Sequence, residues 1–538
     1  KTSARYTEPI YVYDRSGEKS RWRQVKNAVD DWASYAPAEV TADKVFLLRA
    51  VAIDPEGHTS DVTTATYAVG LEKYRKGNNT LLSLAVDPED LFGPEGIYVT
   101  GEAYDTWYVE NNFDTEAPDM PDMNFMQAGR DWERPGCAEF IGDELYLRQN
   151  IGIRLQGQSN RGILPRRFSL YARGVYGGGY WFNEVLFPGH STHAILLRCK
   201  LADALTAALV LDREVSAADA FPCTVFLDGE YWYDCYAREK LCEAFLAERY
   251  GVAKENVLLV RDNDAKGEAK VLYDRLQEFV TTYYMGHEES YKAFCEMVDI
   301  QSFIDFFCCR AFFPCDDFSF ERNWRLWRVW EPDGSPYGDG RRRFILYDMD
   351  LLEDADDAYG EPDKAAVRTL PILTEEEEFT LMYALTFSPE FCRRFILTYM
   401  DLINYNFSPD QVVKKMKALG SEEDLTWNDS FFLRRPEYAI ADIKRTFRLE
   451  GEAVNCRFEV NDPSMGRLTI NTITPETEDG VFEGKYFTDY PVTVTAVPER
   501  GCRFVRWEGD IVSDAISVEA QVKENGLMLR AVFARDIR

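Results

Sequence analysis

The stretch Arg341–Asp350 reads RRRFILYDMD and gives the clearest indication of the fold. Phe344–Leu346 form a short apolar run typical of a buried strand, and the run leads directly to Asp348 and Asp350. Residues two positions apart on a strand point to the same side. Because Mg²⁺ in proteins is held by one or two carboxylates with phosphate oxygens and water, the spacing predicts a divalent-cation site. The alternative is a solvated acidic loop, since acidic residues continue to Asp357.

Two further polar residues precede this strand. Asp317 and Asn323 follow an apolar helical run predicted over Ser302–Phe313. An Asp, then an Asn, then an Asp after a strand is the order found in protein kinases. There the first Asp orients the acceptor hydroxyl, while the Asn and the second Asp hold Mg²⁺ on the nucleotide phosphates. The pattern therefore indicates kinase-like chemistry.

The composition limits the class of protein. The 538 residues predict several domains, and 46% hydrophobic residues exclude global disorder. Lys and Arg number 61 against 92 Asp and Glu, and the net charge of −31 disfavours nucleic acid and anionic membranes as partners. No apolar stretch is long enough for a spanning helix. The chain begins at Lys1 without a methionine or a visible signal peptide, so we expect a removed leader or a trimmed start.

The strand and helix patterns divide the chain into three parts. Residues 1–72 predict a truncated β-sandwich module, with strands at Val45–Ile53 and Val62–Val69. Residues 80–450 mix the two types, and a strand-rich half precedes a helix-rich half. Residues 456–538 return to short strands and predict a small β repeat domain. We therefore expect an α+β chain with a small all-β domain at each end.

Two local patterns add detail. Asp228-Gly229 separates the strand-like segments Thr224–Leu227 and Tyr231–Tyr236 and predicts a hairpin. The twelve cysteines lack the spacing of a disulfide framework, and the four histidines are not spaced with cysteines as in zinc sites. We therefore expect mostly free, buried thiols.

The segment from Leu82 to Leu449 resembles the CotH kinase family, an atypical protein kinase fold of spore-coat and secreted proteins. The resemblance rests on several motifs that occur in the family's order. They are LSLAVDPEDLFGPEGIYVT (Leu82–Thr100), DWER (Asp131–Arg134), IGIRLQGQSNRGILPRRFSLYAR (Ile151–Arg173), LFPG (Leu186–Gly189), VFLDGEYWYDCY (Val225–Tyr236), NWRLWR (Asn323–Arg328) and ILYDMD (Ile345–Asp350). The resemblance implies an atypical protein-kinase-like core between the two β domains, with ATP and Mg²⁺ as cofactors.

The resemblance also implies a role for each matching residue. Asp317 would be the catalytic residue that orients the acceptor hydroxyl, and Asn323, Asp348 and Asp350 would bind the metal. The loop Gln156–Gly162 would cover the phosphates, and the hairpin Val225–Tyr236 would wall the adenine pocket. The residues expected to bind the nucleotide are Gln156, Ser159, Arg161, Arg166, Arg167 and Glu239.

The sequence departs from the family pattern in ways that leave two functions open. Arg166 and Arg167 stand where the family usually has lysines, and the two residue types are not interchangeable at a phosphate. Leu351 stands where the family has a glycine. One function is transfer of the ATP γ-phosphoryl group to a protein Ser or Thr hydroxyl. The other is a catalytically inactive scaffold or binding protein.

The flanking segments resemble two further modules. Tyr6–Ile10 with Leu47–Val69 is similar to a chitobiase C-terminal-type β module, and Gly501–Asp510 with Leu529–Phe533 is similar to an internalin B-repeat. Both modules are typical of exported bacterial proteins. The resemblance thus implies an extracellular or cell-surface location, a protein substrate, and contacts with the cell surface or polysaccharides through the β modules.

Overall fold

The computed structural model describes residues 4–23, 40–261, 268–315, 323–349, 363–375, 380–421 and 428–536. The chain forms two compact units. The first contains Lys1–Ala204, Ala218–Arg249 and Ala418–Gly420, and the second contains Leu205–Ala217, Tyr250–Lys417 and Ser421–Arg538.

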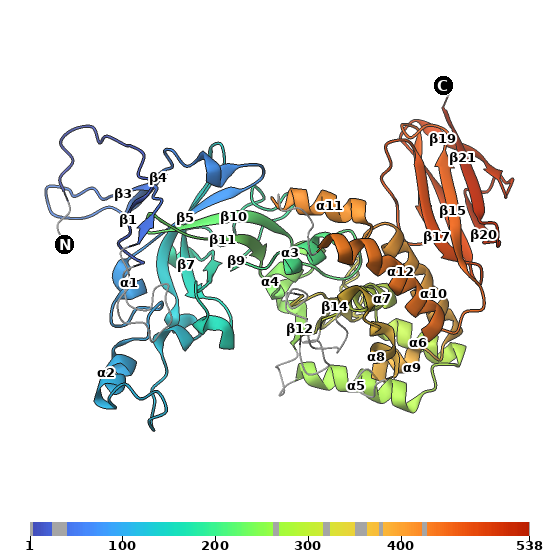
Figure 1. Ribbon diagram of the computed structural model, residues 1–538, viewed down its shortest axis with the longest axis horizontal. Helices are drawn as coiled ribbons and strands as arrows, with labels where there is room; N and C mark the ends of the chain where they lie inside the picture. The colour runs from blue at the N-terminus through green and yellow to red at the C-terminus, as the bar shows by residue number, and fades with distance from the viewer. Residues whose placement is uncertain are drawn as a thin grey trace. The chain divides into compact units, whose positions relative to one another are not determined.

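The first unit is built around a closed β-barrel, drawn in light blue to green in Figure 1. Its strands are β5 (Thr80–Val86), β6 (Arg134–Ile141), β7 (Leu145–Leu155), β8 (Phe168–Tyr171), β9 (Ala194–Arg198), β10 (Ala220–Leu227) and β11 (Glu230–Glu239). Their spatial order is β10-β11-β9-β8-β7-β6-β5, and parallel pairing of β10 with β5 closes the barrel. Side chains such as Leu82, Ile153 and Leu197 fill a buried core. Closure leaves the barrel without an open edge.

The predicted hairpin at Asp228-Gly229 is confirmed. It joins β10 to β11, which pair antiparallel from Leu227 and Glu230 onward. The φ angles of Asp228 and Gly229 are 46° and 91°. A two-residue hairpin turn with positive φ at both positions follows the right-handed twist of the strands, and this explains the preference for Asp-Gly.

The N-terminal strands pack on this barrel. β3 (Phe46–Ala50) and β4 (Thr63–Tyr67) pair antiparallel within the two predicted strand segments, and β1 (Glu18–Lys19) pairs with β2 (Thr41–Ala42). Val45 and Leu71 share a buried cluster with Leu81 of β5. The helices α1 (Pro88–Phe92) and α2 (Glu102–Glu110) follow β5.

The second unit combines a small sheet with helices. The sheet is antiparallel, in the order β12 (Val257–Arg261), β13 (Arg325–Val329) and β14 (Arg343–Ile345). The helices are α5 (Glu268–Thr282), α6 (Glu288–Met297), α7 (Ile300–Phe312), α8 (Thr369–Glu375), α9 (Thr380–Leu385), α10 (Pro389–Asn404), α11 (Pro409–Ala418) and α12 (Asn428–Thr446); α3 (Leu201–Ala208) and α4 (Glu243–Tyr250) lie earlier in the chain. α7 confirms the apolar helix predicted over Ser302–Phe313 and is buried along almost its whole length. It forms the centre of this unit.

A β-sandwich follows α12 and belongs to the second unit (Figure 1, orange to red). One sheet has the order β17-β15-β21-β19 and the other β16-β18-β20. The strands are β15 (Ala453–Val460), β16 (Gly466–Ile470), β17 (Val481–Phe487), β18 (Pro491–Pro498), β19 (Cys502–Gly509), β20 (Ser517–Gln521) and β21 (Leu527–Arg535). The prediction of short strands in this region is confirmed.

The sandwich is joined to α10 by a buried polar network. The carboxylate of Asp401, which is fully buried, accepts hydrogen bonds from the side chains of Asn471 and Tyr486 and from the backbone N–H and hydroxyl of Thr472, at 2.7–3.0 Å. A buried carboxylate needs such donors, because an isolated charge in a protein interior is costly.

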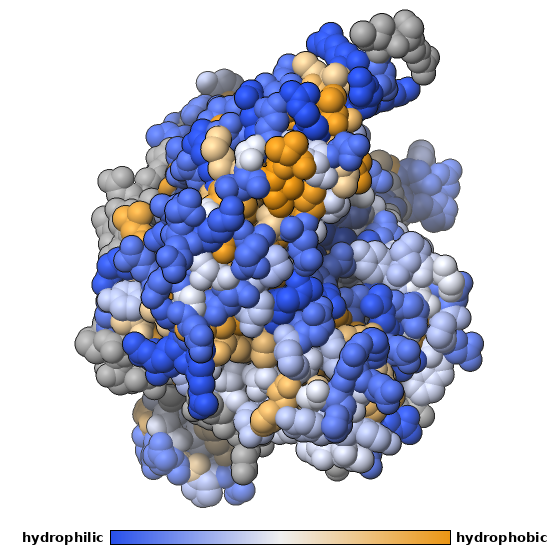
Figure 2. Space-filling view, turned by 90° about the vertical axis from the view of Figure 1, so that its right-hand side faces the viewer, coloured by the Kyte–Doolittle hydropathy of each residue, from blue (hydrophilic) through white to orange (hydrophobic). Residues whose placement is uncertain are grey.

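The chain as described thus mixes α and β structure, and between β5 and α12 its strand-rich part comes before its helix-rich part. Hydrophilic residues cover most of the face shown in Figure 2, with smaller apolar patches between them. This agrees with the 28% of charged residues in the sequence. Among the described residues, no helix is both long enough and apolar enough to cross a membrane.

Candidate functional site

Asn323 and Asp348 lie at the same end of the β13–β14 pair. The two strands are antiparallel, and Arg325 at the start of β13 is paired with Ile345 at the end of β14. Asn323 precedes Arg325 by two residues, and Asp348 follows Ile345 by three. Antiparallel pairing therefore brings together two polar residues that are far apart in the sequence.

Both residues have an unusual backbone conformation. The φ angle is 61° at Asn323 and 56° at Asp348, in the left-handed region. Asn and Asp enter this region more readily than other residues with a side chain, but they still pay a steric cost there. Such conformations cluster at functional sites.

Arg310 of α7 holds the two segments in place. Its guanidinium Nη2 donates to the carbonyl oxygen of Asn323 at 2.6 Å and to that of Tyr347 at 2.7 Å. The Arg310 side chain is buried. On the neighbouring strand, the guanidinium of Arg325 stacks over the ring of Tyr347 at 3.4 Å. One buried cation thus fixes the backbone next to both predicted metal ligands.

Two of the predicted site residues are not described, and of Ser159 only the backbone is. Asp317 and Asp350 lie outside the described residues. Ser159 starts the 3₁₀ turn Ser159–Gly162. Their predicted roles stay predictions.

The predicted phosphate loop is held by its own contacts and by its neighbours. The backbone N–H of Gln156 donates to the carbonyl oxygen of Arg167 at 2.8 Å. Gly157 has a φ of 107°, a conformation that favours glycine. The guanidinium Nη1 of Arg161 donates to the carbonyl oxygens of Met126 and Gln127 at 2.8 and 3.2 Å. The Arg161 guanidinium therefore binds the backbone of the segment that contains Met126 and Gln127.

Arg166, predicted to contact the nucleotide, is packed among aromatic rings. Its side chain is 1% exposed, and its guanidinium lies 3.9 Å from the centre of the Phe125 ring and 5.3 Å from that of Tyr98. Burial lowers the pKa of Arg166 to about 10. Arg167 is half-buried. Burial raises the pKa of the nearby Cys199 thiol, and the positive charge of Arg167 partly offsets this.

Glu239, at the end of β11, is buried and engaged by other residues of its own unit. Its Oε2 accepts hydrogen bonds from Nη2 of Arg249 at 2.9 Å and from the backbone N–H of Asp219 at 3.1 Å. Its Oε1 lies 2.9 Å from Nε2 of His190. Burial, followed by the negative charge of Glu239, raises the pKa of Asp219.

A group of cationic side chains surrounds Tyr171 of β8, and no pattern in the sequence predicts it. Arg154 of β7, Arg173 after β8 and Lys240 after β11 place their cationic groups 4.2, 5.0 and 4.9 Å from the centre of the Tyr171 ring. We call these four residues the Tyr171 cluster. Arg154 and Arg173 belong to the motif Ile151–Arg173, but nothing in the local pattern indicates that Lys240 lies beside them.

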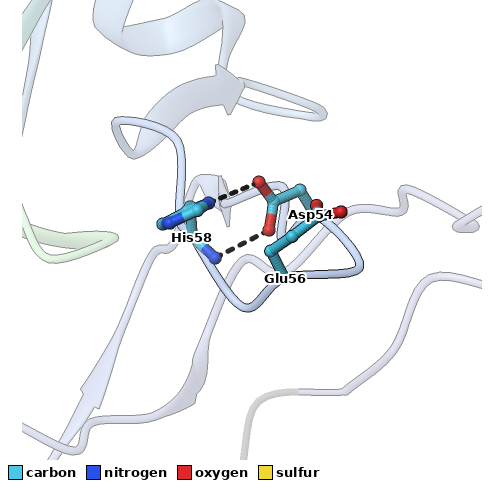
Figure 3. A group of neighbouring side chains, drawn as sticks. All are labelled: Asp54, Glu56 and His58. Carbon is cyan, nitrogen blue, oxygen red and sulfur yellow. Dashed lines mark hydrogen bonds and ion pairs between the residues drawn. The ribbon is translucent and has the colours of Figure 1, made fainter.

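Figure 3 shows Asp54, Glu56 and His58, whose side-chain ligand atoms lie close together. Asp54 Oδ1 accepts the backbone N–H of His58 at 2.7 Å, and Oδ2 lies 2.8 Å from Nδ1 of the same residue. Hydrogen bonding from His58 lowers the pKa of Asp54. All three are exposed, and the contacts are those of the turn between β3 and β4, so the group is explained by local chain reversal.

A cavity of about 700 Å³ lies beside α2 in the first unit. Its lining combines apolar residues such as Phe92 and Val99 with acidic residues such as Glu102 and Asp105. None of the predicted site residues that the structure describes lines it.

The match to a known family covers the central part of the chain. Residues 196–423 match the family model described as CotH kinase protein. No curated protein matches the chain. The matched range includes β11, α7, Arg310, Asn323 and Asp348. Residues 196–423 are therefore similar to the CotH kinase protein family.

Proposed function

We propose that this protein transfers the γ-phosphoryl group of ATP to a Ser or Thr hydroxyl of another protein, with Mg²⁺ as the metal. The observation that carries the proposal is the position of Asn323 and Asp348 at one end of the β13–β14 pair, inside the segment that is similar to the CotH kinase protein family. An Asn and an Asp are the two ligand types that hold Mg²⁺ in protein kinases.

The donor set fits the metal. Amide and carboxylate oxygens are hard ligands, which Mg²⁺ prefers. Two observations support this proposal: both residues have a left-handed backbone, and Arg310 donates hydrogen bonds to the backbone carbonyls of Asn323 and Tyr347. Bound there with Asp350, Mg²⁺ would neutralise charge on the nucleotide phosphates.

Asp317 is proposed to act on the acceptor. Its carboxylate would orient the hydroxyl and accept its proton while the new O–P bond forms and the bond to the β-phosphate oxygen breaks. The other predicted nucleotide-binding residues, Gln156, Ser159, Arg161, Arg166, Arg167 and Glu239, keep their proposed roles.

The proposal extends to location and partners. We propose an extracellular or cell-surface protein that acts on a protein substrate and contacts the cell surface or polysaccharides through its β modules. Immunodetection in fractions of the source cells tests the location, and confinement to the cytosol would contradict it.

A second function is favoured by one observation. A lysine normally presents its charge to phosphate, whereas Arg166 buries its guanidinium against Phe125 and Tyr98. On this basis the protein would bind a ligand or a partner without catalysing transfer.

Incubation of the full chain with ATP and Mg²⁺, followed by mass spectrometry for phosphorylated Ser and Thr, tests the first function. Asp348→Asn keeps the size and the tolerance for positive φ but removes the charge, and it should lower the rate by about 100-fold or more. Asp333→Asn is the matched control, because Asp333 is an exposed residue between β13 and β14. ATP binding without any phosphate incorporation by the wild type would favour the second function.

A further inference from the structure

The Tyr171 cluster combines cationic groups from β7, from the residue after β8 and from the residue after β11, and β9 lies between β8 and β11 in the barrel. Tyr171 of β8 is paired with Gly152 of β7 on one side and with Ala194 of β9 on the other. The backbone N–H of Lys240 donates to the carbonyl oxygen of Ala194 at 3.0 Å. Lys240 then reaches the Tyr171 hydroxyl with its ammonium, which donates at 3.0 Å. The arrangement is thus fixed by backbone pairing across adjacent strands.

The charges in the cluster do not balance. Arg154, Arg173 and Lys240 carry three positive charges, and the buried carboxylate of Glu133 pairs with the two arginines. Glu133 is held mainly by Arg173 at 2.7 Å and by the hydroxyl of Tyr176 at 2.9 Å, whereas Arg154 lies 3.6 Å from it. The contacts described therefore leave an excess of positive charge.

The pKa of Tyr171 reflects the positive charges around its hydroxyl. Burial alone would raise the pKa of its hydroxyl, but the charges of Lys240 and Arg154 outweigh burial and lower the pKa. The side chains of Arg154 and Arg173 remain about one-fifth exposed, at 19% and 21%. Solvent and a ligand can therefore reach them.

Three cationic groups that lie close together repel one another, and a bound anion would reduce this repulsion. Arginine presents a planar fork of N–H donors that matches the oxygens of phosphate, and lysine adds a compact charge. In a chain with a net charge of −31, such a group is a specific feature and not a consequence of composition.

We propose that the Tyr171 cluster binds the oxygens of a phosphate chain. The inference rests on the proposed function for the identity of the ligand, which would be the polyphosphate of the nucleotide. Arg154 and Lys240 carry the contact, and Arg173 holds Glu133 in place beside them. The Tyr171 hydroxyl is oriented by Lys240 and completes the set of donors.

Titration calorimetry of the full chain with inorganic tripolyphosphate, ATP and orthophosphate tests this site. Arg154→Gln and Lys240→Gln should each weaken tripolyphosphate and ATP binding by roughly tenfold or more, because each removes a charge-assisted hydrogen bond. Lys240→Arg keeps the charge and should retain most of the affinity. Equal affinity for orthophosphate and ATP would identify free phosphate as the ligand and would contradict the nucleotide assignment.

Arg148→Gln is the matched control. Arg148 lies on the same strand as Arg154 and also pairs with a buried glutamate, Glu139, at 2.7 Å. The Arg148→Gln variant should bind tripolyphosphate with the affinity of the wild type. Unfolding midpoints of all variants must match the wild type within a few degrees, and Lys240→Arg reports on the site if Lys240→Gln is unstable.

The outcomes separate this inference from the proposed function. If the wild type transfers phosphate while Arg154→Gln and Lys240→Gln bind tripolyphosphate and ATP normally, the phosphate site at the Tyr171 cluster is wrong. The proposed phosphoryl transfer is then supported. If tripolyphosphate binding depends on Arg154 and Lys240 but the wild type transfers no phosphate, the proposed phosphoryl transfer is wrong. The phosphate site at the Tyr171 cluster is then supported. Absence of tripolyphosphate binding by the wild type would overturn the inference.

Discussion

Asn323 and Asp348 share a left-handed backbone, with φ angles of 61° and 56°, and lie at the same end of the β13–β14 pair. The coincidence is informative because the two residues reach this conformation in separate segments. A glycine would adopt it with less strain, so we expect the side chains at both positions to have a functional role.

The first prediction compares two substitutions that both remove the Asp348 side chain. Asp348→Gly should be more stable to urea than Asp348→Ala by about 1 kcal/mol, because only alanine has a Cβ that clashes at positive φ. Both should lose phosphoryl transfer to the same extent. Equal stability of the two variants would show that backbone strain at this position is unimportant.

The second prediction concerns the hydrogen bonds that Arg310 of α7 donates to the backbone carbonyls of Asn323 and Tyr347. Arg310→Met should lower the free energy of unfolding by about 3 kcal/mol, since it leaves the carbonyls of Asn323 and Tyr347 without a charged donor. Arg310→Lys keeps the charge without the guanidinium geometry and should lose less. Urea denaturation measures the unfolding free energy of both variants. An unchanged midpoint for Arg310→Met would show that these hydrogen bonds do not stabilise the fold.

The third prediction concerns the pH dependence of the joint between α10 and the β-sandwich. Burial raises the pKa of Asp401 to about 6 in spite of the hydrogen bonds that its carboxylate accepts. Because the pKa is higher in the folded than in the unfolded chain, the contribution of Asp401 to stability is present below about pH 4 and is lost as the pH rises through about 6. The loss should amount to about 3 kcal/mol.

Urea denaturation at several pH values checks this effect. The difference in unfolding free energy between the wild type and Asp401→Asn should change between pH 4 and 7 and then level off. A difference that is flat over this range would mean that the pKa of Asp401 is not raised.

The fourth prediction concerns two thiols in the barrel. Cys223 and Cys235 are directly opposite each other on β10 and β11, and both are buried. Diamide should oxidise the pair to a disulfide, with both thiol protons and two electrons passing to diamide. Burial raises the pKa of Cys235 well above its usual value, so the reaction should be slow at pH 7 and faster at pH 9.

Peptide mapping without reduction detects this cross-link. Cys235→Ser should abolish it, whereas Cys308 and Cys309, which are adjacent in α7, should stay reduced. Recovery of Cys223 and Cys235 in unlinked peptides after treatment at pH 9 would count against the prediction.

The fifth prediction concerns the C-terminal sandwich. It has a core of its own, with Phe458, Trp507 and Leu529 almost fully buried, so a fragment from about residue 453 should fold alone. It should be less stable than in the full chain, because Thr472 and Tyr486 lose their contact with Asp401. A nuclear magnetic resonance spectrum typical of an unfolded chain would contradict it.

The parts of the fold that could be predicted are those set by local chemistry. The Asp228-Gly229 turn, the apolar helix α7 and the short strands of the sandwich follow from turn preferences and from the spacing of apolar residues. The environment of Arg166 could not be predicted this way. The sequence shows an arginine in place of a lysine, but its burial depends on Phe125 and Tyr98, which come from other segments.

The sequence by itself determined which residues can supply oxygen ligands and cations, because residue type fixes donor chemistry. It also determined which segments become strands and helices, because that choice depends on neighbours in the chain. Only the tertiary structure decided that Asn323 and Asp348 meet at one end of a strand pair under Arg310, and that Lys240 reaches Tyr171 beside Arg154. These relationships depend on strand register and on packing between distant segments, and no local pattern specifies either.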